Sequence, residues 1–167
     1  MPDKLQHNKK EAGGYLLIES MIGISIAVVG LLGVLALLSH SIGLNRVIGN
    51  QLIANYLAAE GIEISKNIID SNTIQGNPWN QGLDMDGKFE ADYSSVNLEP
   101  SQNRKLLFDD ISNFYGYTNG SQSPFTRIIS VYPVSPDEVK IDSTVSWTDR
   151  GSAKLQVTME DYFFNWR

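Results

Sequence analysis

The chain of 167 residues contains no cysteine. Disulfide bonds, thiolate metal sites and cysteine nucleophiles are therefore excluded. Histidine is almost as scarce, because His7 lies in a polar N-terminal segment and His40 lies in a long apolar run. No histidine follows residue 40, so the rest of the chain can hold neither a Ser-His-Asp triad nor a histidine metal site. We expect no metal, no cofactor and no enzymatic activity.

Paired carboxylates are the remaining groups that could support hydrolysis. Asp109 and Asp110 are adjacent, and adjacent residues on a strand point to opposite faces of the sheet. Asp84 and Asp86 resemble the opening of a calcium loop, but no glutamate follows at the spacing that such a loop needs. We expect a polar turn at residues 83–88, with a two-carboxylate hydrolase as a minor alternative.

Basic residues are outnumbered, and the formal net charge is −6. Nucleic-acid binding needs a basic face, because Lys and Arg must neutralise phosphates. Arg104-Lys105 is the only adjacent basic pair after residue 14. We expect this pair to lie in a solvated turn, and we predict no nucleic-acid partner.

Charged residues are also missing from the run between Ser20 and Leu44, which carries no Asp, Glu, Lys or Arg. About 20 apolar residues in a helix span a bilayer core. A cleaved secretory signal has a shorter apolar region of about 7–15 residues. Lys4, Lys9 and Lys10 precede the run, so the N-terminus is expected in the cytoplasm and the bulk of the chain outside.

Glu19 stands at the start of this apolar run. A carboxylate inside a membrane is costly, although less so near its edge. One interpretation is that Glu19 reaches the headgroups and complements the helix N-terminus. The other is that it pairs with a cation in an assembly: a cut after Gly14 would give Tyr15 a new α-amine, which could neutralise the carboxylate of a neighbouring subunit. Physical reasoning leaves both open.

The segment Gly14-Tyr15-Leu16-Leu17-Ile18-Glu19 resembles the prepilin-type cleavage and methylation motif of type IV pilins and pseudopilins. The resemblance extends over residues 1 to about 70. It implies that a prepilin peptidase cuts after Gly14 and N-methylates Tyr15, and that Glu19 is needed for assembly. The family usually has Phe in place of Tyr15 and often Thr in place of Leu16.

The resemblance also implies partners and a location. The partners would be the prepilin peptidase, the lipid bilayer, and other pilin or pseudopilin subunits that pack through the N-terminal helix. The protein would be held in the cytoplasmic (inner) membrane as a single-pass protein and then join an extracytoplasmic or cell-surface filament. Major pilins often carry a proline in this helix, and its absence here favours a minor pilin-like protein.

Small residues recur in the apolar run. Gly23, Ala27, Gly30 and Gly33 would let helices approach closely in a membrane, and we expect them to pack against other subunits. The alternative is that glycine is simply frequent in membrane helices.

The chain is expected to divide into a basic leader at 1–14, a transmembrane half of a spine helix at 15–44, its extracytoplasmic half at 45–70, and a globular domain at 71–167. We expect the leader to be disordered. The outer half of the helix has an apolar stripe, which should pack on the chain's own globular part. Turn-forming residues after Asp70 predict the helix end. The stripe consists of Ile53, Leu57, Ile64 and Ile68.

The globular part reads as β-rich. Phe89, Ala91 and Tyr93 alternate with Glu90 and Asp92, which predicts a short half-buried strand. Residues 125–132 predict a strand closed by Pro133 and Pro136.

Two further strands are predicted at 139–147 and 155–159, joined by a hairpin loop at 148–152. With residues 125–132 they should form an antiparallel meander, which needs a cover on its apolar face. We therefore predict an α+β fold, with a long spine helix packed on a small C-terminal antiparallel sheet. The pilin-like resemblance implies the same arrangement. One face of the second strand should hold Val139, Ile141, Ser143, Val145 and Trp147.

Two functions remain open from sequence. The preferred one is a filament-forming, prepilin-like structural subunit. The alternative is a single-span, signal-anchored membrane protein with an external binding domain that forms no filament.

Overall fold

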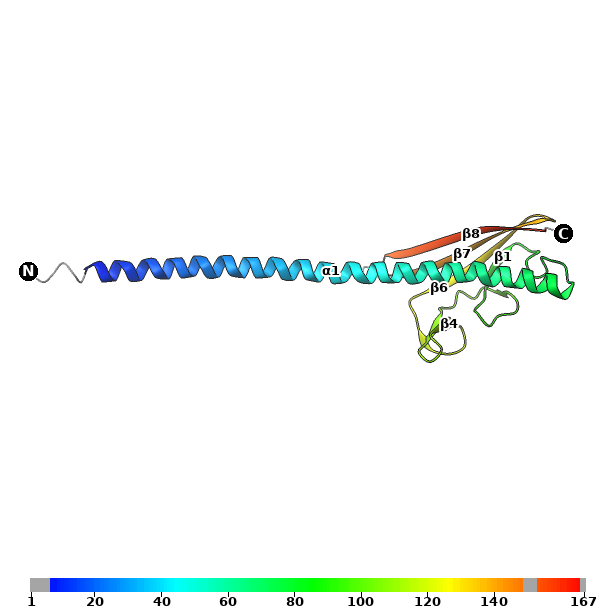
Figure 1. Cartoon of the computed structure of the whole chain (residues 1–167), viewed down its shortest axis with the longest axis horizontal. Helices are drawn as coiled ribbons and strands as arrows, with labels where there is room; N and C mark the ends of the chain where they lie inside the picture. The colour runs from blue at the N-terminus through cyan, green and yellow to red at the C-terminus, as the bar shows by residue number, and fades with distance from the viewer. Residues whose placement is uncertain (1–6, 149–152, 166–167) are drawn as a thin grey trace, which may run out of the picture. The chain divides into compact units, whose positions relative to one another are not determined.

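The computed structural model describes residues 7–148 and 153–165, with side chains from Tyr15 onward (Figure 1). The chain divides into two units, Met1–Arg46 and Val47–Arg167. One helix, α1, runs from His7 to Gln75. The expected disorder of the leader is therefore wrong for residues 7–14, where Lys, Glu and Ala are good helix formers. Residues 1–6 lie outside the described part.

The helix also continues past its predicted end at Asp70 because of its C-terminal cap. The N–H of Asn77 donates to the carbonyl of Asn72 at 2.9 Å, and the N–H of Gly76 donates to the carbonyl of Thr73 at 3.2 Å. These two bonds form a Schellman motif. Gly76 has a φ of 74°, a value that glycine adopts without strain. The stop signal is therefore Gly76, and the polar residues before it remain helical.

The globular unit contains one sheet in the order β2-β1-β6-β7-β8, in which every neighbouring pair is antiparallel. The predicted meander corresponds to its last three strands, and the predicted hairpin loop falls mostly on residues 149–152, outside the described part. A second, three-stranded sheet has the order β4-β3-β5. The strands are β1 Gly87–Glu90, β2 Glu99–Pro100, β3 Leu107–Asp109, β4 Phe114–Gly116, β5 Ser121–Gln122, β6 Thr126–Ser135, β7 Glu138–Thr148 and β8 Lys154–Phe164.

Pro133 does not close β6, contrary to the sequence prediction. The strand continues to Ser135, with an irregular register between Pro133 and Ser135. Pairing of β6 with β1 involves only residues 129–131, so at Pro133 one side of β6 has no neighbouring strand. A proline is tolerated there because its missing N–H removes no bond from the ladder.

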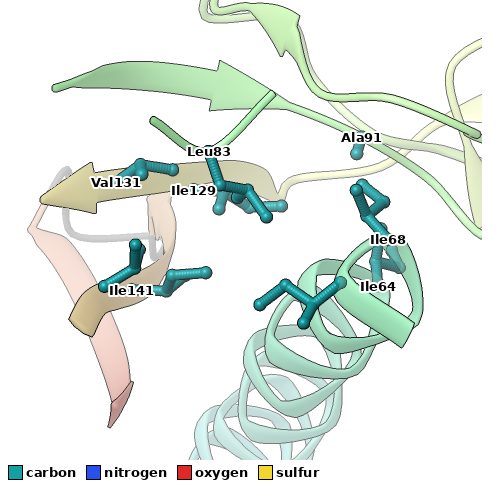
Figure 2. Close-up of a cluster of buried hydrophobic side chains, with 9 residues drawn as sticks. Ile64, Ile68, Leu83, Ala91, Ile129, Val131 and Ile141 are labelled. Carbon is teal, nitrogen blue, oxygen red and sulfur yellow. The ribbon is translucent and has the colours of Figure 1, made fainter. Parts of the chain in front are cut away.

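The later part of α1 covers the sheet, as the apolar stripe predicted. Leu57, Ile64 and Ile68 are buried, and Ile53 is partly buried. Figure 2 shows Ile64 and Ile68 facing Ile129 and Ile141 across the core. A second cluster places Ala54, Leu57 and Ala58 of α1 against Leu106, Phe125, Val145 and Trp147. On β7 the predicted inward face is confirmed, since Val139, Ile141, Ser143, Val145 and Trp147 are all buried.

Arg127 is fully buried on the inward face of β6, between Phe125 and Ile129. Its Nη1 donates to Glu60 Oε2 at 2.8 Å and to the carbonyl of Leu57 at 3.1 Å. Its Nη2 donates to the carbonyl of Ala91 at 2.6 Å. One guanidinium thus ties β6, the helix and the segment after β1 together. A charge buried in this way needs such partners, because desolvation costs several kcal/mol.

Beside this arginine, the helix approaches β7 very closely at Gly61. A Cβ on Gly61 would overlap Ser143 Oγ and would lie 3.2 Å from Arg127 Cδ. Glycine in a helix interior otherwise destabilises by up to about 1 kcal/mol relative to alanine. Gly61 is therefore required by the contact between helix and sheet.

We predict that Gly61→Ala destabilises the globular unit by about 1–3 kcal/mol, because the added methyl must displace buried side chains. Gly49→Ala is the matched control: it lies on the same helix, with no atom within 4 Å of an added Cβ. It should be neutral or stabilising by up to about 1 kcal/mol. Urea unfolding of the full chain in micelles, followed by circular dichroism, measures both. Equal stability of the two variants would contradict the assigned contact.

Candidate functional site

The residues of the sequence motif lie on the part of α1 that belongs to the first unit, Met1–Arg46. Gly14 belongs to the helical backbone, just before the first side chain that the structure describes. Tyr15 is 81% exposed, and Glu19 follows one turn later on the same face, together with Ile18 and Ile22. A helix places residues i and i+4 side by side. A free α-amine on Tyr15 would therefore lie within one helical turn of Glu19.

The small residues of the run also share a face. Gly23, Ala27 and Gly30 are spaced by four and three residues, and Gly33 follows three residues later. No atom lies within 4 Å of a Cβ built on any of the three glycines. This strip leaves the helix backbone open to close approach by another helix.

Every residue from Tyr15 to Arg46 is exposed, although large aliphatic side chains surround the helix on all sides. Exposed apolar surface of this extent is typical of membrane spans and of interaction sites. Within the described residues, α1 is the one helix long and apolar enough to cross a membrane. The hydroxyl of Ser20 donates to the carbonyl of Leu17 at 2.9 Å, and that of Ser25 to the carbonyl of Met21 at 2.7 Å. Each hydroxyl therefore has a hydrogen-bond acceptor within the helix.

In the globular unit, the strand predicted around Phe89 is shorter than expected, and its polar side chains point toward the interior. β1 ends at Glu90, and Glu90 and Asp92 are buried, whereas Tyr93 is 55% exposed. On a regular half-buried strand, both carboxylates would lie on the face opposite Phe89 and Ala91. They point inward because hydrogen-bond donors, several of them distant in sequence, compensate each of them.

Glu90 is held mainly by Arg104. Its Oε2 accepts from Arg104 Nε at 2.7 Å, and its Oε1 accepts from Ser101 Oγ and from the N–H groups of Gln102 and Arg104. Burial raises the pKa of Glu90, but the hydrogen bonds from Arg104 and Ser101 outweigh it and leave the pKa below its ordinary value. Arg104 therefore lies in an organised loop and not in the solvated turn that the sequence suggested.

Asp92 organises the neighbouring turn. Its Oδ1 accepts from Ser94 and Ser95, and its Oδ2 accepts from the N–H of Tyr117 at 3.1 Å. Burial raises the pKa of Asp92, and these bonds lower it further than burial raises it. Both carboxylates thus act as hydrogen-bond acceptors that shape the loop from residue 91 to residue 104.

A cavity of about 400 Å³ lies beside this loop, lined by Glu90, Asp92, Arg104 and Tyr117 among others. The Arg104 guanidinium lies 4.5 Å from the centre of the Tyr117 ring, a cation–π distance. Burial raises the pKa of Tyr117 to about 12, so its phenol is neutral at physiological pH. Within the described residues no group of three or more His, Cys, Asp or Glu side chains could hold a metal, and Asp84 and Asp86 are both exposed.

Sequence reasoning missed Arg127 and Glu60, although a signal was present. Arg127 alternates with Phe125 and Ile129 on what must be the inward face of β6. A cation at such a position requires a buried partner. Gly61, next to Glu60 in the helix, was the second signal, because an isolated helical glycine often marks close packing.

No protein-family model matches this chain, and neither the curated proteins nor the solved structures contain a significant match to it.

We predict that Glu90→Gln destabilises the fold at neutral pH by about 1–3 kcal/mol, because it removes the charge that Arg104 faces. A carboxylate with a lowered folded pKa stabilises above its unfolded pKa, here near 4.5, and loses this contribution as the pH falls through the folded value. The difference between wild type and Glu90→Gln should therefore shrink from pH 5 downward. Urea unfolding between pH 3 and 7 measures it.

Glu99→Gln is the control for this experiment. Glu99 lies 3.4 Å from the same Arg104, but its side chain is 70% exposed, so its loss should cost less than about 1 kcal/mol. Equal effects of the two variants, or a Glu90 effect independent of pH, would refute the assigned role of Glu90.

Proposed function

We propose that the protein is a prepilin-like structural subunit that is cleaved after Gly14, N-methylated at Tyr15 by a prepilin peptidase, and assembled through its N-terminal helix into a type IV pilus or pseudopilus. The observation that carries this proposal is the position of Glu19. It is the only Asp, Glu, Lys or Arg between Tyr15 and Asn45, and it lies one turn after Tyr15 on an otherwise apolar, exposed helix.

Cleavage would change the electrostatics of this site. Before it, no Lys or Arg lies between Tyr15 and Asn45 to pair with Glu19. After it, Tyr15 carries an α-amine, which keeps its positive charge when N-methylated. In a stack of parallel helices offset along their axes, the amine of one subunit can meet Glu19 of the next. Pairing removes the penalty of an isolated charge in an apolar medium.

The apolar surface of residues 15–44 is compatible with both proposed states of the subunit, first in the membrane and then in the filament. In the cytoplasmic membrane, lipid would cover residues 15–44, with the globular part outside. In a filament, the same surface would pack against other subunits, and the strip of Gly23, Ala27, Gly30 and Gly33 would allow close approach. The absence of proline from α1 favours a minor pilin-like role within this proposal.

We predict that Glu19→Val leaves membrane insertion intact but lowers incorporation into filaments about tenfold or more, since losing about 1.4 kcal/mol of pairing energy per subunit suffices for that factor. The variant is expressed in the native host beside wild type. Sheared filaments and membranes are then compared by quantitative immunoblot.

Ser25→Ala is the matched control, because it also removes a polar side chain from the run but one whose hydroxyl is satisfied within the helix. It should assemble like wild type. Unchanged incorporation of Glu19→Val would refute the role of Glu19. Absence of wild-type protein from any filament would instead favour the single-span membrane protein with an external binding domain.

A further inference from the structure

A second cavity, of about 510 Å³, opens at the end of α1 in the globular unit. Its walls come from the last turns of the helix, the turn that follows it, and the end of β8. This volume falls within the range of about 300–1,000 Å³ typical of small-molecule sites. The residues used below are Asp70, Asn77, Trp79, Phe164 and Asn165.

The turn that forms one wall is fixed by hydrogen bonds. The cap bonds of Gly76 and Asn77 hold the chain against the helix end. Asn72 Nδ2 also donates to the carbonyl of Gln81 at 2.9 Å and to that of Trp79 at 3.4 Å. Trp79 is partly buried and packs on the core cluster, so its ring is held in place. The wall is therefore organised before any ligand arrives.

The opposite wall is tied down at the end of β8. The N–H of Asn165 donates to the carbonyl of Asp137 at 3.0 Å, and Asn165 Nδ2 donates to Asp137 Oδ1 at 3.1 Å. These bonds use donors of Asn165, and no described residue donates to its Oδ1. Two sequence-distant segments, 70–79 and 164–165, thus form one cleft.

The chemistry of the lining combines aromatic surface with neutral and acidic hydrogen-bonding groups. Trp79 and Phe164 supply rings, Asn77 and Asn165 supply amides, and Asp70 supplies a carboxylate that makes no hydrogen bond or ion pair with the described residues. Sugars present weakly polar C–H faces that stack on aromatic rings, while their hydroxyls donate to carboxylates and amide oxygens.

The charge of the cleft restricts the ligand further. Among the described residues that line it there is no Lys or Arg, and its one acidic side chain is Asp70. A phosphate, a nucleic acid or an acidic sugar would meet repulsion without a compensating cation. We propose that this cleft binds a neutral oligosaccharide, with its ring faces on Trp79 and its hydroxyls on Asp70 and the two asparagines. The proposal is independent of cleavage and of filament assembly.

The test uses the full chain, labelled with ¹⁵N, in phosphocholine micelles, because sugar-headed detergents would compete. Cellotriose, maltotriose and tri-N-acetylchitotriose are titrated to 20 mM, with trigalacturonate as the anionic comparison. The indole N–H resonance of Trp79 should shift saturably with at least one neutral trisaccharide and not with trigalacturonate.

Asp70→Asn and Trp79→Leu should each weaken this binding about tenfold or more. Asp70 is exposed and Leu keeps apolar bulk at position 79, so both variants should remain folded. Ile74→Ala, which changes an 85% exposed residue on the same helix end outside the cleft, should bind like wild type. No saturable shift with any neutral trisaccharide would overturn the proposal. So would preference for trigalacturonate, or unchanged affinity of Asp70→Asn.

Discussion

The globular unit depends on one buried cation. Arg127 emerges from β6 into the core and contacts Glu60, the Leu57 carbonyl on α1 and the Ala91 carbonyl after β1. Removing one partner of such a pair typically costs about 3–5 kcal/mol, because the other charge is left uncompensated. Apolar contacts alone allow a helix to slide along a sheet, whereas a guanidinium with three directed bonds fixes where it lies. The lack of a side chain at Gly61 provides the clearance that this arrangement needs.

The two lengths of α1 meet different physical requirements. From residue 47 onward, one face of the helix is buried against the chain's own sheet, and the rest is exposed, including Ile48, Leu52 and Tyr56. From Tyr15 to Arg46 every residue is exposed and most are apolar. That surface is long and apolar enough to cross a membrane, and it carries a single acid, Glu19, near its start. The proposed filament subunit reconciles both halves, because one packs within the subunit and the other packs between subunits.

Local patterns predicted much of this fold. The inward face of β7, the three-stranded meander and the stripe around Leu57, Ile64 and Ile68 all follow from periodicity, and the structure confirms them. Periodicity failed where distant donors decide the outcome. Glu90 and Asp92 turn inward because Arg104 and the N–H of Tyr117 reach them, and β6 passes Pro133 because its neighbour has already ended. The placement of Glu19 one turn after Tyr15 follows from helical spacing alone, whereas the cleft beside Trp79 joins segments more than 80 residues apart and could not be predicted.

The central claim is that the chain becomes functional only after its leader is removed and Tyr15 becomes its first residue. The most direct measurement is mass spectrometry of the N-terminal peptide of the protein isolated from its native host. The account predicts a peptide that begins with N-methylated Tyr15. A peptide that begins at Met1, or at any residue other than Tyr15, would contradict it.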